Sequence, residues 1–194
     1  MARPRQFDAA VALDAALGLF REHGYAGTSA EMLSAAMQIG KQSLYNTFGD
    51  KWSLYCSALE RYSSMETAAH IATLRSRATA LAGIEAMMER VVVESGNACL
   101  GVGSLSEFGL ETDEGRDLSE VRKAPSRLLT TALAKALRQA AAEGDVFAGL
   151  EARHAAAFLL ANVAGIRLAA RGGASTAELR AMAQLAIRAL RSPK

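Results

Sequence analysis

The sequence predicts an all-α protein, and three features of its composition indicate this. Hydrophobic residues make up 51% of the chain but aromatic residues only 6%, and much of the apolar content is alanine and leucine, the best helix formers. Proline occurs only three times in 194 residues. β-Branched residues rarely alternate with polar ones, as they would in half-buried strands. We therefore expect a small N-terminal three-helix unit followed by a larger helical bundle.

The first expected helix runs from about Asp8 to His23, after a short polar arm that contains Arg3 and Arg5. Gly24 is a suitable C-terminal stop for this helix. The apolar side of the helix recurs at the three- and four-residue spacing of an amphipathic helix. That side consists of Leu13, Ala16, Leu17 and Phe20.

Two further short helices are expected, joined by a tight turn. Thr28 or Ser29 caps the second helix, and Gln38 and Ile39 form the turn. The third helix runs from about Lys41 to Phe48 and ends at Gly49. The inward residues of the second helix are Leu33, Ala36 and Met37. Helices this short are not stable alone in water, so the three are expected to pack together.

Beyond residue 50 the sequence pattern predicts five or six longer helices. The first of them is capped by Asp50 and extends from Lys51 to about Leu74. The others are expected at about 80–96, 99–109, 117–143, 151–171 and 176–191. The segments that separate them are Gly96-Asn97, the acidic stretch around Glu111 to Glu114, Gly144-Asp145 and Gly172-Gly173. Pro125 either kinks the helix at 117–143 or sits in its first turn.

The pair of short helices around Gln38 has the spacing of a helix-turn-helix. In that motif the second helix enters the major groove of DNA while the first braces it. Leu44 and Phe48 can pack inward with Ile39, which leaves a polar outward face on the third helix. The outward residues are Lys41, Gln42, Ser43, Asn46 and Thr47. Gln42 and Asn46 are suited to adenine, and Lys41 to guanine or a phosphate.

Further candidate DNA contacts flank this helix. The side chains of Thr28 and Ser29 and the amide groups beside them can hold a phosphate at a helix start, and Lys51 can do the same. Arg3 and Arg5 can enter the minor groove or pair with phosphates. Charge gives no support, because six basic and six acidic side chains leave the first 62 residues with no net charge. An ordinary polar helix face is the alternative interpretation.

The N-terminal segment also resembles the signature of TetR-family transcriptional regulators, over about residues 3 to 62. The resembling residues are Arg3-Pro4-Arg5, Phe7-Asp8, Phe20, Gly24, Tyr25, Thr28, Ser29, Leu33, Ala36, Ile39, Ser43-Leu44-Tyr45, Phe48, Asp50-Lys51 and Leu54. This resemblance is specific because many spaced positions agree together. It implies a homodimer, usually a repressor, with a variable C-terminal ligand-sensing bundle. A helix-turn-helix DNA-binding domain is therefore expected at residues 1–50, and a helical ligand-sensing and dimerisation domain at residues 51–194.

The resemblance also implies which residues face DNA. They are Thr28, Ser29, Lys41, Gln42, Ser43, Tyr45, Asn46, Thr47 and Lys51, and Tyr45 commonly touches a phosphate in the family. Two positions depart from the family pattern. Gln38 stands where the family often has glycine, which relieves a left-handed backbone, and Gly40 stands where it often has a serine or threonine cap. These departures leave the operator details open.

Two apolar stripes near the C-terminus predict contact between two copies of the chain. An apolar stripe on a terminal helix must find a partner, and small residues allow close helix packing. The expected interface residues are Ala156, Leu160, Val163, Ala164, Leu179, Met182, Leu185 and Ala186. The alternative is that these residues close the core of one copy. A dimer would place two reading helices about 34 Å apart on a palindrome.

A binding pocket for an unknown small-molecule effector is expected among the middle helices. Such pockets are mostly apolar with a few polar groups. The candidate lining residues are Met65, Leu74, Met87, Met88, Val91, Leu105, Phe108, Leu128 and Phe158. The candidate polar anchors are His70, Glu107, Asn162 and Arg167. The alternative is that the methionines are ordinary core residues.

The sequence contains no motif of an enzyme. The three histidines, His23, His70 and His154, are far apart, and no set of His and Cys has metal-ligand spacing. No nucleophile elbow or phosphate-binding glycine loop occurs. We therefore expect neither catalysis nor a cofactor or metal. A helical dimer that senses ligands or thiol oxidants and acts through other proteins is the remaining alternative.

Cysteine content and hydropathy bear on location. Cys56 and Cys99 lie on apolar helical stretches and are expected to be buried free thiols; a redox sensor would need an exposed thiolate of low pKa. No apolar run reaches the ~18 residues that a membrane span needs. No signal-peptide core follows the N-terminal arginines, so a cytoplasmic protein without a membrane partner is expected.

Overall fold

A computed structural model describes residues 7–109 and 111–191. Within these ranges the chain forms nine α-helices, one 3-10 helix and no β-strand, which confirms the all-α prediction. The helices are α1 (Ala9–His23), α2 (Ala30–Met37), α3 (Lys41–Phe48), α4 (Lys51–Leu74), α5 (Ala80–Val93), η1 (Glu94–Gly96), α6 (Leu100–Glu107), α7 (Asp113–Ala142), α8 (Ala152–Arg171) and α9 (Thr176–Arg188). None of the described helices is long and apolar enough to cross a membrane.

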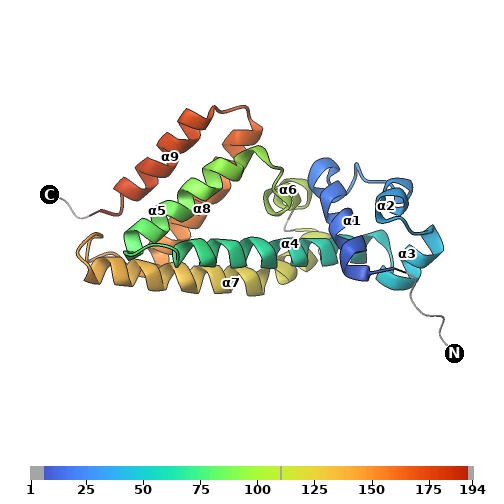
Figure 1. The fold of residues 1–194 in the computed structure, drawn as a ribbon, viewed down its shortest axis with the longest axis horizontal. Helices are drawn as coiled ribbons and strands as arrows, with labels where there is room; N and C mark the ends of the chain where they lie inside the picture. The colour runs from blue at the N-terminus through green and yellow to red at the C-terminus, as the bar shows by residue number, and fades with distance from the viewer. Residues whose placement is uncertain (1–6, 110, 192–194) are drawn as a thin grey trace.

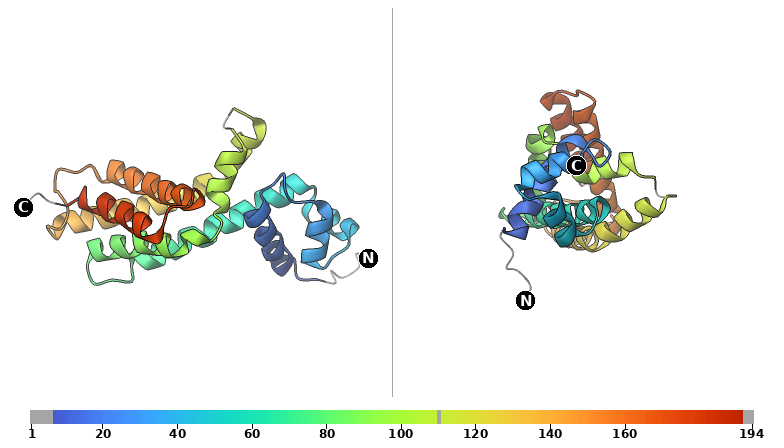
Figure 2. Two further views of the ribbon diagram at one scale, coloured as in Figure 1. Left: turned by 90° about the horizontal axis from the view of Figure 1, so that it is seen from above. Right: turned by 90° about the vertical axis from the view of Figure 1, so that its right-hand side faces the viewer.

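The molecule is elongated, and α4 and α7 run side by side along its length (Figure 1). Helices α1, α2 and α3 cover one end of α4, whereas α5, α8 and α9 gather at the other end. The left view of Figure 2, from above, shows the same separation of the first three helices from the larger bundle. The expected succession of a small unit and a larger bundle is therefore what the chain forms.

The first three helices share a hydrophobic cluster with the first half of α4. Phe20, Leu33 and Leu44 are each at most 1% exposed, and they belong to one cluster with Leu54 and Tyr55 of α4. The same cluster also takes in single residues from α6 and α7. The short helices therefore bury their apolar sides largely against a helix that begins beyond residue 50.

Helix ends follow local chemistry that was largely visible in the sequence. Asp8 caps α1, Ser29 caps α2 and Asp50 caps α4, each by accepting hydrogen bonds from backbone N–H groups of the first turn. Gly24 and Gly49 end α1 and α3 with φ angles of 70° and 81°. These left-handed backbones favour glycine because it lacks a Cβ atom.

Helix α7 begins earlier than expected. Thr112 caps it, and Asp113 and Glu114 form its first turn, where acidic side chains interact favourably with the helix dipole. The acidic stretch thus starts the helix, and its expected role as a break between helices is wrong in part. Pro125 consequently lies well inside α7 and not in its first turn. The carbonyl of Pro125 accepts a hydrogen bond of 3.4 Å from the Thr67 hydroxyl of α4.

A second hydrophobic cluster joins α5, α7, α8 and α9 with the end of α4. Four of the expected pocket residues belong to this cluster and are buried in it, namely Leu74, Met87, Met88 and Val91. Three of the expected interface residues are also buried there, namely Ala156, Leu179 and Ala186. These three small or apolar side chains close the core of a single copy, which was the alternative stated for them.

A partly buried ionic cluster connects four elements beside this core. Arg167 of α8 is 5% exposed, and its guanidinium donates to the Glu94 carbonyl at 2.6 Å and lies 3.5 Å from the Glu66 carboxylate of α4. Arg90 of α5 pairs with Glu66 at 3.1 Å and Glu94 at 2.8 Å. Burial and the neighbouring Arg90 lower the pKa of His70 to about 4, so its ring is neutral at pH 7.

We expect Arg167→Met to destabilise the protein by about 3 kcal/mol, because the Glu66 and Glu94 carboxylates would then share the single guanidinium of Arg90 and the Glu94 carbonyl would lose its donor. Urea denaturation followed by circular dichroism measures this. Arg153→Met on the exposed side of α8 is the matched control, and it should change the free energy of unfolding by no more than about 0.5 kcal/mol. Equal losses in both variants would show that the cluster contributes nothing specific.

Candidate nucleic-acid interface

The turn between α2 and α3 is tight, and hydrogen bonds between Ser34 and Ile39 close it. Gln38 adopts a left-handed backbone with φ of 54°, as its departure from glycine suggested. The Ile39 N–H donates to the Ser34 carbonyl at 3.2 Å, and the Ser34 hydroxyl donates to the Ile39 carbonyl. Ile39 is buried. These contacts set the direction in which α3 leaves the turn.

Helix α3 buries one side and exposes a polar side. Leu44 is 1% exposed and anchors the helix in the N-terminal cluster. The exposed residues are Lys41, Gln42, Ser43, Tyr45 and Asn46, and Thr47 is half-buried. The Gln42 amide donates to the Asn46 side-chain oxygen at 3.2 Å. The predicted outward face therefore exists, and it presents adjacent amide groups on an eight-residue helix of the kind that the major groove admits.

The cations around α3 are already engaged in this conformation. Lys41 forms an ion pair with Glu31 of α2, and this hydrogen bond is the main reason why the pKa of Glu31 falls to about 2. Lys51 lies with its ammonium group 4.3 Å from the centroid of the Tyr25 ring. A phosphate contact by either lysine would compete with these partners.

The two hydroxyl residues at the start of α2, Ser29 and Thr28, differ in exposure. Ser29 is exposed and caps the helix, so it lies beside free first-turn amides that can meet a phosphate. Thr28 is 1% exposed, and its hydroxyl donates to the Gly24 carbonyl at 2.6 Å. The side chain of Thr28 therefore supports the loop and does not reach the surface as expected. Arg3 and Arg5 lie outside the described residues.

A contact that sequence reasoning did not anticipate joins the α1–α2 loop to α6. The Glu107 carboxylate accepts hydrogen bonds from the backbone N–H groups of Tyr25 at 2.9 Å and Ala26 at 2.7 Å. A Cβ atom at Gly24 would lie 3.0 Å from a Glu107 oxygen, so the glycine lets the carboxylate approach. Glu107, a candidate pocket anchor, instead binds the N-terminal unit. In the sequence, only Gly24 hinted at this contact, because a glycine leaves room for another group to approach the backbone closely.

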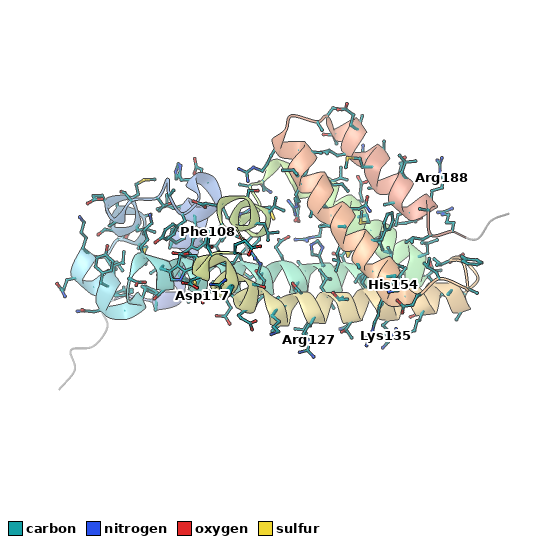
Figure 3. The ribbon with its side chains drawn as sticks, turned by 180° about the vertical axis from the view of Figure 1, so that it is seen from behind. Phe108, Asp117, Arg127, Lys135, His154 and Arg188 are labelled. Atoms are coloured by element: carbon teal, nitrogen blue, oxygen red, sulfur yellow. The ribbon has the colours of Figure 1, made fainter. Side chains whose placement is uncertain are left out.

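Aromatic side chains surround this junction. Tyr25, Trp52, Tyr55 and Phe108 have neighbouring ring centroids 5.2–5.9 Å apart. The indole N–H of Trp52 donates to Asp117 of α7 at 3.3 Å, and Phe108 and Asp117 lie at this end of the molecule in Figure 3. Phe108, expected in a ligand pocket, packs here between the N-terminal unit and the bundle.

The remaining pocket candidates do not converge on one cavity. Met65, Leu105, Leu128 and Phe158 are between 43% and 61% exposed. Leu74 and Met88 line two separate grooves, of about 270 Å³ and 1040 Å³. Of the polar candidates, Asn162 donates to the Phe158 carbonyl of its own helix, and His70 and Arg167 belong to the ionic cluster.

No group of three or more His, Cys, Asp or Glu residues in the described part of the chain gathers as metal ligands do. Burial, with Asp117 and Asp50 nearby, raises the pKa of Cys56 to about 11. Its thiol is therefore protonated at neutral pH, and Cys56 lacks the low pKa of a redox sensor.

Comparisons with known proteins identify the family. Residues 12–56 match the family described as bacterial regulatory proteins, tetR family. The HTH-type transcriptional repressor ComR of Escherichia coli (strain K12) is 30% identical over 192 residues, which cover 96% of this chain and 90% of that protein. The HTH-type transcriptional regulator YezE of Bacillus subtilis (strain 168) is 29% identical over 151 residues, covering 75% of this chain and 76% of that protein.

A solved structure shows the same architecture on DNA. The TetR family transcriptional regulator CifR, solved as a cysteine mutant complexed with a 26-bp double-strand operator DNA, matches with a TM-score of 0.81 and 27% identity over 97% of this chain and 100% of that chain. These similarities agree with the exposed polar face of α3 behind a tight turn. The chain thus belongs to the TetR family of bacterial DNA-binding transcriptional regulators.

Proposed function

We propose that this chain is a ligand-responsive repressor that binds a palindromic double-stranded operator as a homodimer in the cytoplasm. The observation that carries the proposal is the polar side of α3, held outward by the burial of Leu44. The similar proteins support it, because ComR is named a repressor and CifR was solved on its operator. The chain acts by binding, not by catalysis.

Each part of the interface has its own role on DNA. Gln42 and Asn46 read base edges, because their amide groups match adenine in the major groove. Tyr45, Lys51 and the exposed start of α2 at Ser29 hold phosphates, which position the helix without reading sequence. Ser43, Thr47 and Lys41 complete the contact, with Lys41 leaving Glu31 for DNA. Arg3 and Arg5 extend it along the neighbouring groove.

Two copies associate through α8 and α9. Phe158, Leu168 and Leu185 are 43%, 58% and 59% exposed on these two helices, and water-exposed apolar side chains of this size favour a partner surface. Of the expected interface residues, Leu160, Val163, Ala164, Met182 and Leu185 remain partly or fully exposed in one copy. A four-helix contact between two copies would cover them and set the distance between the two α3 helices.

The effector signal travels through α4. We propose residues 1–50 as the DNA-binding domain and residues 51–194 as the sensing and dimerisation domain, with α4 rigidly joining them. An effector that binds the larger bundle and shifts α4 would change the separation of the two α3 helices. This coupling requires that the effector bind one separation better than the other. Glu107 provides a second link, because it holds the loop at Tyr25 and Ala26 from α6.

Gel-shift assays on the promoter nearest the gene test the DNA contacts. We expect Tyr45→Ala and Lys51→Ala to weaken binding to all sequences. We expect Gln42→Ala and Asn46→Ala to cost about 1–3 kcal/mol at the bases they read and to change which bases are preferred. Arg138→Ala, on the exposed side of α7, is the control and should bind as the wild type does. No salt-sensitive, sequence-specific shift on any genomic fragment would refute the DNA proposal.

The dimer is tested with one introduced charge. Leu185→Glu should leave the chain monomeric at concentrations where the wild type is dimeric, because a carboxylate in an apolar interface loses its hydration. Light scattering during size-exclusion chromatography measures the mass. Leu128→Glu on α7 is the matched control, since this leucine is 61% exposed outside the proposed interface. A dimeric Leu185→Glu protein would place the contact elsewhere.

The link through Glu107 predicts a local effect. Glu107→Gln replaces one acceptor oxygen by an NH₂ group, which cannot accept a hydrogen bond from a backbone N–H. Hydrogen exchange measured by NMR should therefore become faster at the Tyr25 and Ala26 amides, with weaker operator binding. Glu60→Gln on the exposed side of α4 should change neither. Unchanged exchange at both amides in Glu107→Gln would contradict the link.

A further inference from the structure

A groove of about 1040 Å³ opens beside α5, between α9 and the end of α4. Figure 1 shows α5 and α9 running next to each other above the far end of α4. Two ion pairs across the helices show that they run in opposite directions. Arg191 lies 2.6 Å from Glu85, near the start of α5, and Arg180 lies 2.7 Å from Glu89, further along it. The groove is thus built from three elements of the larger bundle, away from the DNA-facing end.

The walls of the groove are largely apolar and partly open to water. Ala82 and Ala86 of α5 and Ala183 and Ile187 of α9 contribute to them. Val93, at the last turn of α5, also lines the groove and is 69% exposed. From Ala82 to Val93 the helix rises by roughly 16 Å. An extended apolar molecule can therefore lie along α5 and cover side chains that are otherwise exposed to solvent.

The charges along the groove leave an excess of guanidinium groups. Its two carboxylates, Glu85 and Glu89, are paired with Arg191 and Arg180, and Arg90 is held by the ionic cluster. Arg77 and Arg188 also line the groove. Within residues 7–109 and 111–191 no carboxylate lies within ion-pair distance of either one. Arg77 precedes α5, and the opposite course of α9 brings Arg188 to the same end of the groove.

We propose that this groove binds an amphipathic anion: a carboxylate or phosphate on an extended alkyl or aryl body. The anionic group pairs with Arg77 and Arg188, whose planar guanidinium groups match the geometry of carboxylate and phosphate oxygens. The apolar body lies along α5 toward Val93. A cationic amphiphile is disfavoured because both groove carboxylates already have arginine partners.

The position of the site suggests how its occupant would act, and this part rests on the proposed function. A bound molecule touches the segment at the end of α4, through Thr73 and Arg77, and α9 at the same time. The same α4 carries the DNA-binding unit at its other end, and α9 belongs to the proposed dimer contact. An anion in the groove would therefore favour one position of α4 relative to the partner copy.

Isothermal titration calorimetry with dodecanoate, below its micelle concentration, tests the site. We expect binding to the wild type, at least about tenfold weaker binding to the Arg77→Gln/Arg188→Gln double variant, and weaker binding of dodecanol and dodecylamine to the wild type. Dodecyl phosphate should bind as dodecanoate does. Arg127→Gln is the matched control, because Arg127 lies on α7 away from α9 (Figure 3), and it should bind dodecanoate normally.

Three results would overturn the proposal: no dodecanoate binding to the wild type, equal binding to the double variant, or dodecanol binding as tightly as dodecanoate. Circular dichroism confirms that the double variant is folded before its result is used. Gel shifts with and without dodecanoate measure whether binding in the groove changes the affinity for the operator. Dodecanoate binding with unchanged operator affinity would keep the site and refute the coupling, whereas a ligand-free protein that binds no DNA would refute only the proposed function.

Discussion

The continuous helix α4 is the constraint on which the rest of the structure depends. Its 24 residues begin beside α3 and end within the larger bundle, and its buried side chains belong to both hydrophobic clusters. Leu54 and Tyr55 are fully buried under α1 to α3, whereas Leu74 packs with α5 and α7. Because interiors pack densely and transmit strain, a displacement of α4 in the bundle must displace the short helices as well.

Polar contacts make this arrangement specific. The ionic cluster at Glu66 connects the middle of α4 to α5, η1 and α8. At the other end, Glu107 binds the α1–α2 loop, and Arg61 of α4 forms an ion pair with Asp14 of α1. Apolar burial alone would tolerate small rotations between helices, but a carboxylate that accepts two backbone N–H groups does so only in a narrow range of positions.

In the DNA-binding unit, buried residues hold α3 in place and exposed polar residues form its outer face. Leu44 and Ile39 are buried, and the polar residues between them and Phe48 remain outside. Periodicity predicted this face correctly, because a helix with one apolar side has little choice of orientation. Periodicity did not predict that Thr28 points inward or that Lys41 pairs with Glu31. Both depend on where a neighbouring loop or helix lies, and spacing along one element carries no such information.

The sequence alone determined the all-α class, most helix boundaries and the exposed polar side of α3, because caps, glycine stops and apolar spacing act within a few residues. It also predicted that the chain has an N-terminal unit and a larger bundle. Only the tertiary structure decided which apolar residues close the core and which remain exposed. Ala156 and Ala186 turned inward while Leu185 stayed exposed, although all three lie on expected stripes. Burial depends on the crossing of helices far apart in the chain, and so does the groove between α5 and α9.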